Sequence, residues 1–332
     1  MANKSAIIDS WGRRPRKLRL SVTDRCNMRC MYCMPKKFAW YPKNEMLSYE
    51  KITRLSRIFV GMGIEKIRLT GGEPLVRPQI EKLIHALSNV KGIKALGLTT
   101  NGLLLGDKVP LLKQAGLRSV NISLDTLVEK KFKTITGVEG LSKVQRSLRV
   151  ARDAGFEVKI NTVIIRGQND DELGAFAEFA IAEGVSVRFI EFMPLDGAHV
   201  WNPTLVVSKA EMMQKLGQIG IKLGAVNNDA SDPARLYTFG NANNTLGFIP
   251  SVSEPFCSTC DRVRLTSQGK FLTCLFEQTP WDIKGLLRSG RSDKEIAEFL
   301  IACYAKKFQG RGSIMRGKNL LSGAKLMNTI GG

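Results

Sequence analysis

The sequence contains no apolar run that approaches the roughly 18 residues needed to span a membrane. The N-terminal stretch MANKSAIIDSWGRRPRK has basic residues but no apolar segment after them, so it lacks the pattern of a secretory signal. Disordered and collagen-like chains are also excluded, because 43% of the 332 residues are hydrophobic and 24% are charged. We therefore expect a soluble cytoplasmic protein with no membrane partner.

Acidic residues are scarce, and both ends of the chain are basic. The 50 Lys and Arg against 30 Asp and Glu give a formal net charge of +20. Such an excess is typical of proteins that bind nucleic acid, an anionic membrane surface or a small polyphosphate. Solvated basic termini would explain it equally simply. Few aromatic residues interleave with the basic runs, which argues against nucleic-acid binding.

Strand-like and helical patterns alternate through the first two thirds of the chain. Runs rich in Ile, Val and Leu lie at 17–22, 64–69, 93–99, 118–124, 156–163 and 186–192. Helical patterns lie between them, for example after Ser48, a suitable N-cap, and from Leu141 to Ala151. The alternation predicts a parallel α/β sheet or barrel. Six units fall short of the eight in a closed barrel, so we expect a partial, open-sided (β/α)6 barrel, with a doubly wound sheet as the alternative.

The pattern changes after about residue 205. Short strand-like pieces (LYTF, LGFI, VRLT and KFLTCLF) are separated by turns, and a helical stretch covers roughly 281–307. We expect two domains: the barrel over residues 1–205, and a smaller α+β module over 206–332 that covers the open side of the barrel.

Six of the seven cysteines form two sets of three, Cys26, Cys30 and Cys33, and Cys257, Cys260 and Cys274. Disulfides are not expected inside cells, whereas thiolates are good ligands for zinc or iron–sulfur clusters. A structural zinc site prefers four ligands, but the first loop offers three and has no His nearby. Three thiolates on a four-iron cluster would leave one iron open for a substrate or cofactor. A zinc site stays the alternative for both sets, and Cys303 is interpreted as a spectator thiol.

Polar and glycine residues follow the ends of several predicted strands. The segment TGGEPL at 70–75 begins where the second strand ends, and its two glycines let the backbone approach a ligand closely. Thr99, Ser123 and Met193 stand at the ends of three other strands. Because ligands gather at the carboxyl ends of parallel strands, we expect these residues to face one rim.

Four predicted strands carry a cation, namely Arg19, Arg68, Lys159 and Arg188. A charge inside a barrel is costly unless it is paired, so a bound polyanion would compensate the set. Arg262 and Arg264 alternate on one face of the strand after the second cysteine set, which is typical of an anion-binding wall. For any one of these side chains, a solvated surface position is the simpler alternative.

The stretch LRLSVTDRCNMRCMYCMP resembles the signature of radical S-adenosylmethionine (SAM) enzymes. Within that superfamily, the sequence is similar over nearly its whole length to the GTP 3′,8-cyclases. The motifs that carry this resemblance are the first cysteine loop, TGGEPL, GLTTNG at 97–102, RFIEFM at 188–193, FCSTCDRVRL at 256–265 and the terminal Gly-Gly.

The resemblance implies two 4Fe-4S clusters, one on each cysteine set, and SAM as a cofactor. By residue, it implies SAM contacts at Tyr32, Gly72, Ser123 and Met193. It implies GTP contacts at Arg19, Arg68, Thr99, Lys159, Arg262 and Arg264. Arg188 is a further candidate as one of the strand cations. Gly331 and Gly332 are also candidates, because the tail of the family is thought to reach the active site.

The implied activity is the radical cyclisation of GTP to (8S)-3′,8-cyclo-7,8-dihydroguanosine 5′-triphosphate, an early step of molybdenum cofactor biosynthesis. The resemblance also implies a reductant of the flavodoxin or ferredoxin type and, downstream, a cyclic pyranopterin monophosphate synthase; a homodimer is compatible with it. One alternative is another radical SAM enzyme with an auxiliary cluster, such as a peptide maturase, which would not require Arg262 and Arg264. The other is a zinc- or nucleic-acid-binding protein, suggested by the charge of +20 and the cysteine sets.

Overall fold

The six expected strands are present as adjacent parallel strands in a computed structural model that describes residues 7–35, 38–195, 200–240, 245–310 and 327–331. They are β1 (Lys17–Ser21), β2 (Lys66–Thr70), β3 (Ala95–Thr100), β4 (Ser119–Ser123), β5 (Glu157–Ile164) and β6 (Ser186–Glu191). The helices between them are α1 (Tyr49–Gly61), α2 (Ile80–Ser88), α3 (Leu105–Gln114), α4 (Glu129–Thr136), α5 (Leu141–Asp153) and α6 (Leu173–Glu183).

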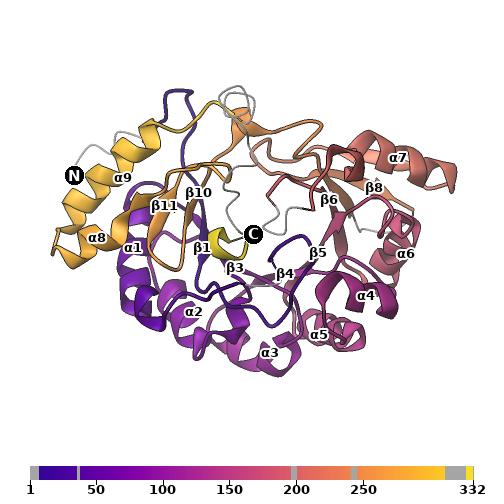
Figure 1. Cartoon of the computed structure of the whole chain (residues 1–332), viewed down its shortest axis with the longest axis horizontal. Coiled ribbons are helices and arrows are strands. Elements are labelled where there is room, and N and C mark those ends of the chain that lie inside the picture. The colour runs from indigo at the N-terminus through magenta and orange to yellow at the C-terminus, as the bar shows by residue number, and fades with distance from the viewer. Residues whose placement is uncertain (1–6, 36–37, 196–199, 241–244, 311–326, 332) are drawn as a thin grey trace.

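These six helices lie outside the curve of the sheet (Figure 1). Helices on one face confirm the open partial barrel, whereas the alternative of a doubly wound sheet, with helices on both faces, is wrong. Local sequence explains the units: the Ser48 side chain accepts a hydrogen bond from the Lys51 N–H at the start of α1, as an N-cap does. Ile52, Leu55 and Phe59 of that helix are buried against the sheet.

The strands of the second half continue the same sheet instead of forming a separate one. They are β7 (Leu223–Val226), β8 (Arg235–Phe239), β9 (Thr245–Ile249), β10 (Arg262–Leu265), β11 (Lys270–Leu272) and β12 (Trp281–Asp282). The order is β12-β11-β10-β1-β2-β3-β4-β5-β6-β9-β8-β7, with β10 parallel to β1 and β9 parallel to β6. The C-terminal module thus extends both edges of the barrel, because the outer backbone groups of β1 and β6 need hydrogen-bonding partners.

The remaining helices lie at the ends of this extended sheet and inside its curve. The helices α7 (Lys209–Gln218), α8 (Ile283–Arg288) and α9 (Asp293–Ala305) accompany the added strands, and short 3-10 helices span Lys43–Glu45, Pro74–Val76, Pro203–Leu205 and Cys257–Thr259. The last described helix, α11 (Met327–Ile330), lies within the curve of the barrel (Figure 1). None of the helices in the described ranges is both long and apolar enough to cross a membrane.

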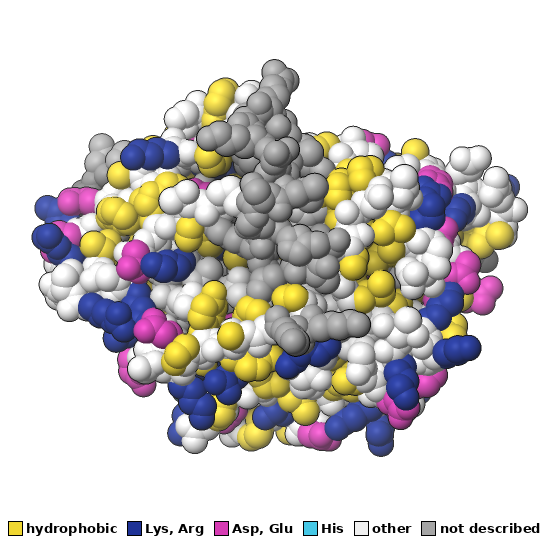
Figure 2. Space-filling model, viewed as in Figure 1, with side chains coloured by type: hydrophobic (Ala, Val, Ile, Leu, Met, Phe, Trp, Pro, Cys, Tyr) yellow, Lys and Arg dark blue, Asp and Glu magenta, His cyan; other side chains and the backbone are white. Residues whose placement is uncertain are grey.

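The strands alternate between a buried outer face and a polar inner face. In β5, Val158 and Ile160 are fully or nearly fully buried under the helices, whereas Lys159 and Asn161 lie on the opposite side. The outer surface of the molecule carries charges of both signs. Figure 2 shows Lys and Arg side chains interspersed with Asp and Glu over the visible face. The sheet therefore collects polar groups on the inside of its curve, where the site lies.

Candidate active site

The first cysteine set occupies the loop that follows β1. Cys30 and Cys33 share a turn in which the Cys33 N–H donates to the Cys30 carbonyl at 3.0 Å. Burial raises the pKa of Cys26, and it raises the pKa of Cys33 to about 12. Burial, and then the neighbouring Cys33, raises the pKa of Cys30 well above its usual value. Three thiols gathered in a dry site need a positive partner to ionise, and the iron of a 4Fe-4S cluster fits this donor set.

The glycine pair after β2 packs against this cysteine loop. The Gly72 N–H donates to the Thr23 carbonyl at 2.7 Å, and a Cβ on Gly72 would overlap the carbonyl oxygen of Arg25. The position therefore requires glycine, and its N–H is used by the loop and is not free for a ligand. The close approach that the glycines allow is to the loop backbone itself.

Glu73 links the ends of β2 and β3. Its carboxylate accepts hydrogen bonds from Thr100 Oγ1 at 2.8 Å and from the Asn101 N–H at 2.7 Å. Burial raises the pKa of Glu73 to about 7, against the effect of these bonds. Glu73 thereby fixes the rim on which Gly72 and Thr99 stand.

A cavity of about 260 Å³ lies inside the curve of the sheet, at the carboxyl ends of the parallel strands. It brings together residues that the sequence separates widely: Arg19, Cys26, Cys30, Tyr32, Cys33, Gly72, Thr99, Ser123, Arg188, Met193, Arg262 and Arg264 all line it. Arg68 and Lys159 are not among its lining residues. Arg68 donates to the Leu98 carbonyl at 3.1 Å, and Lys159 pairs with Glu157.

Buried arginines dominate the electrostatics of the cavity. Arg19 lies in register between Arg264 on β10 and Arg68 on β2. Burial, and then the charges of Arg264 and Arg262, lower the pKa of Arg19 well below its usual value. Burial, followed by Arg262, lowers the pKa of Arg264 to about 10. Like charges held together out of water favour an anionic ligand, which would offset both costs.

The second cysteine set lies beside these arginines. Cys257 and Cys260 precede β10, and the antiparallel β10–β11 hairpin brings Cys274 back toward them, as expected. Burial alone would raise the pKa of Cys260, but the charges of Arg262 and Lys307 outweigh it and lower the pKa to about 6. Three sulfur donors in a positive environment fit a second iron–sulfur cluster. In the described ranges, no three His, Cys, Asp or Glu side chains have the geometry of a site for one metal ion.

Comparisons with known proteins agree with this arrangement. The radical SAM superfamily model matches residues 20–180, and the model for molybdenum cofactor synthesis, C-terminal part, matches residues 185–312. The mitochondrial GTP 3′,8-cyclase of Arabidopsis thaliana is 43% identical over 91% of this chain and 77% of its own length. The GTP 3′,8-cyclase of Thermodesulfovibrio yellowstonii is 42% identical over 98% of this chain and 99% of its own length.

The chain belongs to the GTP 3′,8-cyclase family. Among solved structures, SuiB of Streptococcus suis bound to precursor peptide SuiA matches 92% of this chain and 70% of its own, with a TM-score of 0.63 and 17% identity, which shows a shared fold. Radical SAM chemistry implies a 4Fe-4S cluster with SAM, and this family carries an additional C-terminal cluster. Membership excludes the alternative of a non-enzymatic zinc- or nucleic-acid-binding protein.

The last residues that the structure describes reach the cavity. Met327 and Asn328 line it, and Asn328 Nδ2 donates to the Asp24 carbonyl at 3.0 Å. Arg264 Nη1 donates to the carbonyls of Ile330 and Gly331. Gly331 has a φ of +76°, and a Cβ there would overlap Thr70 Oγ1, so a side chain does not fit. Gly332 lies outside the described residues.

Four lining residues were not among the predicted site residues, namely Thr70, Asn121, Asn161 and Asn328. Polar side-chain atoms that are buried and have no hydrogen-bond partner in the described ranges occur around the cavity on Thr70, Thr99, Asn121, Asn161, Arg188, Arg262 and Asn328. Buried polar atoms are costly unless a ligand satisfies them. The signal for Asn161 was its place two residues after Lys159, on the same face of a strand that otherwise disfavours Asn.

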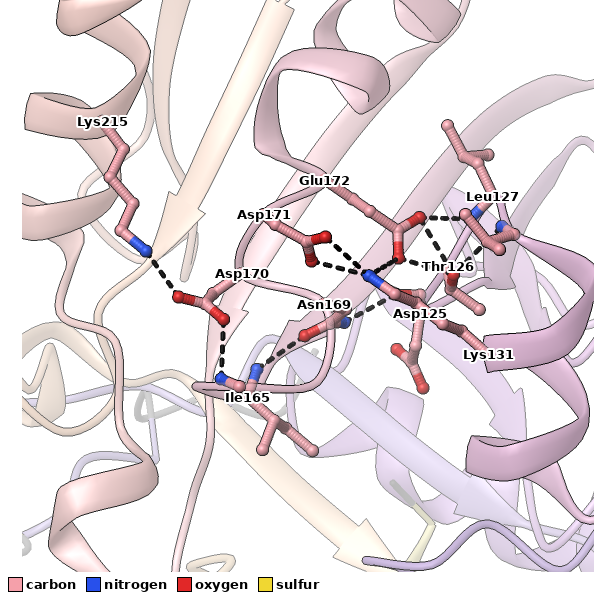
Figure 3. Close-up of polar contacts among 12 residues, drawn as sticks. Asp125, Thr126, Leu127, Lys131, Ile165, Asn169, Asp170, Asp171, Glu172 and Lys215 are labelled. Atoms are coloured by element: carbon pink, nitrogen blue, oxygen red, sulfur yellow. Dashed lines mark hydrogen bonds and ion pairs between the residues drawn. The ribbon is translucent and has the colours of Figure 1, made fainter.

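A polar cluster outside the cavity holds the end of β4 in place (Figure 3). Asn169 Nδ2 donates to the Asp125 carbonyl at 2.6 Å, and Glu172 accepts from Thr126 Oγ1 at 2.7 Å. Lys131 pairs with Glu172 at 3.1 Å. The Asp125 side chain can then accept from the Tyr32 hydroxyl at 2.6 Å, and burial raises the pKa of Asp125 to about 6. This cluster fixes Tyr32 beside the first cysteine set.

Proposed function

We propose that this chain cyclises GTP to (8S)-3′,8-cyclo-7,8-dihydroguanosine 5′-triphosphate, as an early step of molybdenum cofactor biosynthesis. The observation that carries the proposal is one cavity that joins the first cysteine loop to the buried arginines beside the second cysteine set. A triphosphate is a polyanion whose charge would offset that of these arginines. The names of the Arabidopsis and Thermodesulfovibrio relatives support the same substrate.

The cavity has one end for each reactant. Cys26, Cys30 and Cys33 would hold the first cluster, and the SAM contacts would be Tyr32, Gly72, Ser123 and Met193. Cys257, Cys260 and Cys274 would hold the second cluster. Four of the proposed GTP contacts line the cavity, namely Arg19, Thr99, Arg262 and Arg264, and Arg188 and the Gly331-Gly332 tail are further contacts. The other two, Arg68 and Lys159, would have to leave the Leu98 carbonyl and Glu157 to reach the nucleotide. When bound, the first cluster and SAM supply the 5′-deoxyadenosyl radical that removes the ribose 3′ hydrogen of GTP.

The protein itself positions the nucleotide and encloses the reacting groups. The arginines from β1 and β10 lie in register, so they can hold phosphate oxygens at fixed spacing while the ribose faces the first cysteine loop. Strand ends, α11 and the C-terminal module surround the cavity, which would keep a carbon radical away from reactive solutes such as thiols and O2. We further propose that residues 1–205 form the barrel domain, which holds the first cluster, and that residues 206–332 form the module that holds the second cluster and carries the Gly-Gly tail.

The test is anaerobic incubation of reconstituted protein with SAM, dithionite and each of GTP, ATP, CTP and UTP. We expect 5′-deoxyadenosine and a cyclised nucleotide with GTP alone, because the family acts on guanine. Deuterium placed at the 3′ position of GTP should appear in 5′-deoxyadenosine. Cleavage of SAM that leaves all four nucleotides unchanged would contradict the proposal.

Arg264→Ala is expected to weaken GTP binding by roughly 1.5–3 kcal/mol, or roughly 10- to 150-fold, because a charge-assisted hydrogen bond in a dry site is lost. Cleavage of SAM without GTP should survive, since Arg264 lies with the second cysteine set. Arg288→Ala, at an exposed position on α8, is the matched control. Calorimetric titration with GTP measures the effect, and unchanged affinity in both Arg262→Ala and Arg264→Ala would count against this phosphate site.

The partners of the reaction follow from its chemistry. We propose a small reductant of the flavodoxin or ferredoxin type, whose usual acidity would complement the net charge of +20. We also propose a cyclic pyranopterin monophosphate synthase as the enzyme that takes the product, a cytoplasmic location, and a homodimer as the form to test by light scattering.

A further inference from the structure

Lys307 is a buried lysine beside the second cysteine set. It follows the end of α9, and only 3% of it is exposed. Its Nζ donates to the Arg262 carbonyl at 2.7 Å and to Cys260 Sγ at 3.7 Å, and it lies 5.4 Å from the centre of the Tyr304 ring. In the part of the chain that the structure describes, no carboxylate forms an ion pair with it. Its charge therefore faces a sulfur.

Arg13, near the N-terminus of the chain, ties the segment that carries Lys307 to the second cysteine set. The Arg13 guanidinium donates to the carbonyls of Cys257 at 2.7 Å, Phe308 at 2.6 Å and Gln309 at 3.0 Å. Arg13 is itself fixed by buried Asp9, at 2.6 Å. Lys307 is thus held at Cys260 by contacts that span almost the whole chain, which a solvated surface lysine would not need.

Gly310 brings the same segment into direct contact with the cysteines. A Cβ built on Gly310 would lie 2.8 Å from Cys257 Cβ, so the backbone passes the cysteine without room for a side chain. Tyr304, at the other end of the segment, is fully buried, and its hydroxyl donates to the Arg13 carbonyl at 3.2 Å. The segment therefore has little freedom to carry Lys307 away from Cys260.

We propose that Lys307 is a positioning residue of the second cluster, and that its buried charge at Cys260 sets the reduction potential of that cluster. The inference rests on the proposed function, which places a cluster on Cys257, Cys260 and Cys274. Reduction adds a negative charge to an iron–sulfur cluster, and a cation or hydrogen-bond donor at a ligand sulfur stabilises the reduced form. Lys307 thus shifts the potential to a more positive value. Its second bond, to the Arg262 carbonyl, aligns the start of β10 with the cluster.

The test is an EPR-monitored redox titration of both clusters in the reconstituted full-length protein. Lys307→Met removes the charge and keeps an unbranched side chain that is one atom shorter. We expect a more negative midpoint potential for the second cluster, with the first cluster unchanged. Lys307→Arg keeps the charge and should stay near the wild-type potential. Lys306→Met, which removes a charge from the exposed neighbouring residue, is the matched control and should leave both potentials unchanged.

The outcomes separate this inference from the proposed function. If the wild type itself shows one cluster, the proposed second cluster fails before any variant is measured. If the wild type shows two clusters and Lys307→Met leaves the second potential unchanged, or shifts both clusters together, only the role of Lys307 is overturned. Loss of the second cluster from both Lys307→Met and Lys307→Gln, but not from Lys307→Arg, would also overturn it, since Lys307 would then retain the cluster without tuning it.

Discussion

Cys26→Ala is expected to remove about half of the bound iron, from about eight to about four irons per chain, and to abolish the reductive cleavage of SAM. Cys26 is one of three thiols in a half-buried loop. The two carboxylates of the lining already have partners, since Asp125 accepts from the Tyr32 hydroxyl and Glu191 accepts from the Val252 N–H. A cluster with two remaining thiolates would be lost. Iron and sulfide analysis after anaerobic reconstitution measures the first effect, and chromatography of 5′-deoxyadenosine measures the second.

Two other cysteines provide the controls for this experiment. Cys257→Ala should also lose about half of the iron, but it should keep the cleavage of SAM, because its set serves the nucleotide. Cys303→Ala should keep all of the iron, since Cys303 lies in the hydrophobic core and is 3% exposed. Tightly bound zinc in place of iron in the wild type would refute both cluster assignments.

Deletion of Gly331 and Gly332 should lower the yield of cyclised nucleotide per SAM cleaved by about 10- to 100-fold, the size expected when a reacting group is misplaced by about 1 Å. The carbonyl of Gly331 accepts a hydrogen bond from Arg264, and the preceding helix α11 is anchored through Asn328. The truncated chain would keep its fold, its clusters and most of its GTP affinity while Arg264 loses one of its fixed partners. Quantifying product and 5′-deoxyadenosine in the same samples gives the ratio.

Gly331→Ala probes the same tail with one methyl group. The added Cβ would overlap Thr70 Oγ1, so the tail must move out of the cavity, and the product ratio should fall as in the deletion. Gly290→Ala is a matched control, because Gly290 has a similar φ of +72° with nothing near the new Cβ. If the truncated protein cyclises GTP at the full-length rate, the tail is only a frayed end.

The sequence predicted those parts of the structure that local patterns encode. The cysteine spacing, the period of the strands and the residues that follow strand ends gave the barrel and most of the cavity lining, because each depends on neighbours within a few positions. The extension of the sheet by β9 and β10 was not predicted, because the sequence of an edge strand does not show which other strand pairs with it. Arg13 and Lys307 were missed for the same reason: the contact of Arg13 with Cys257 spans 244 positions.

Residues of the inner face were missed for a different reason. Asn121 and Asn161 are polar residues within strands, and it is the register that places them with predicted site residues. Asn121 lies opposite Thr99, and Asn161 lies opposite Ser123 and Arg188. Gly72 was expected to approach a ligand, but the structure places it against the backbone of the cysteine loop, where its N–H donates to the Thr23 carbonyl. That contact depends on how the loop folds back, which the sequence does not show.

The pairing of β1 with β10 has a consequence for how this protein is made. Lys17 on β1 is in register with Arg262 on β10. The outer edge of β1 therefore has no strand partner until about four fifths of the chain has left the ribosome. Pairing at such long range is slow to form, and an uncovered edge strand invites association with other chains. The cysteines beside β10 come together only at that late step. Both barrel edges thus stay uncovered until the C-terminal strands β9 and β10 are made, and the second cysteine set is assembled only once β10 and β11 have been synthesised.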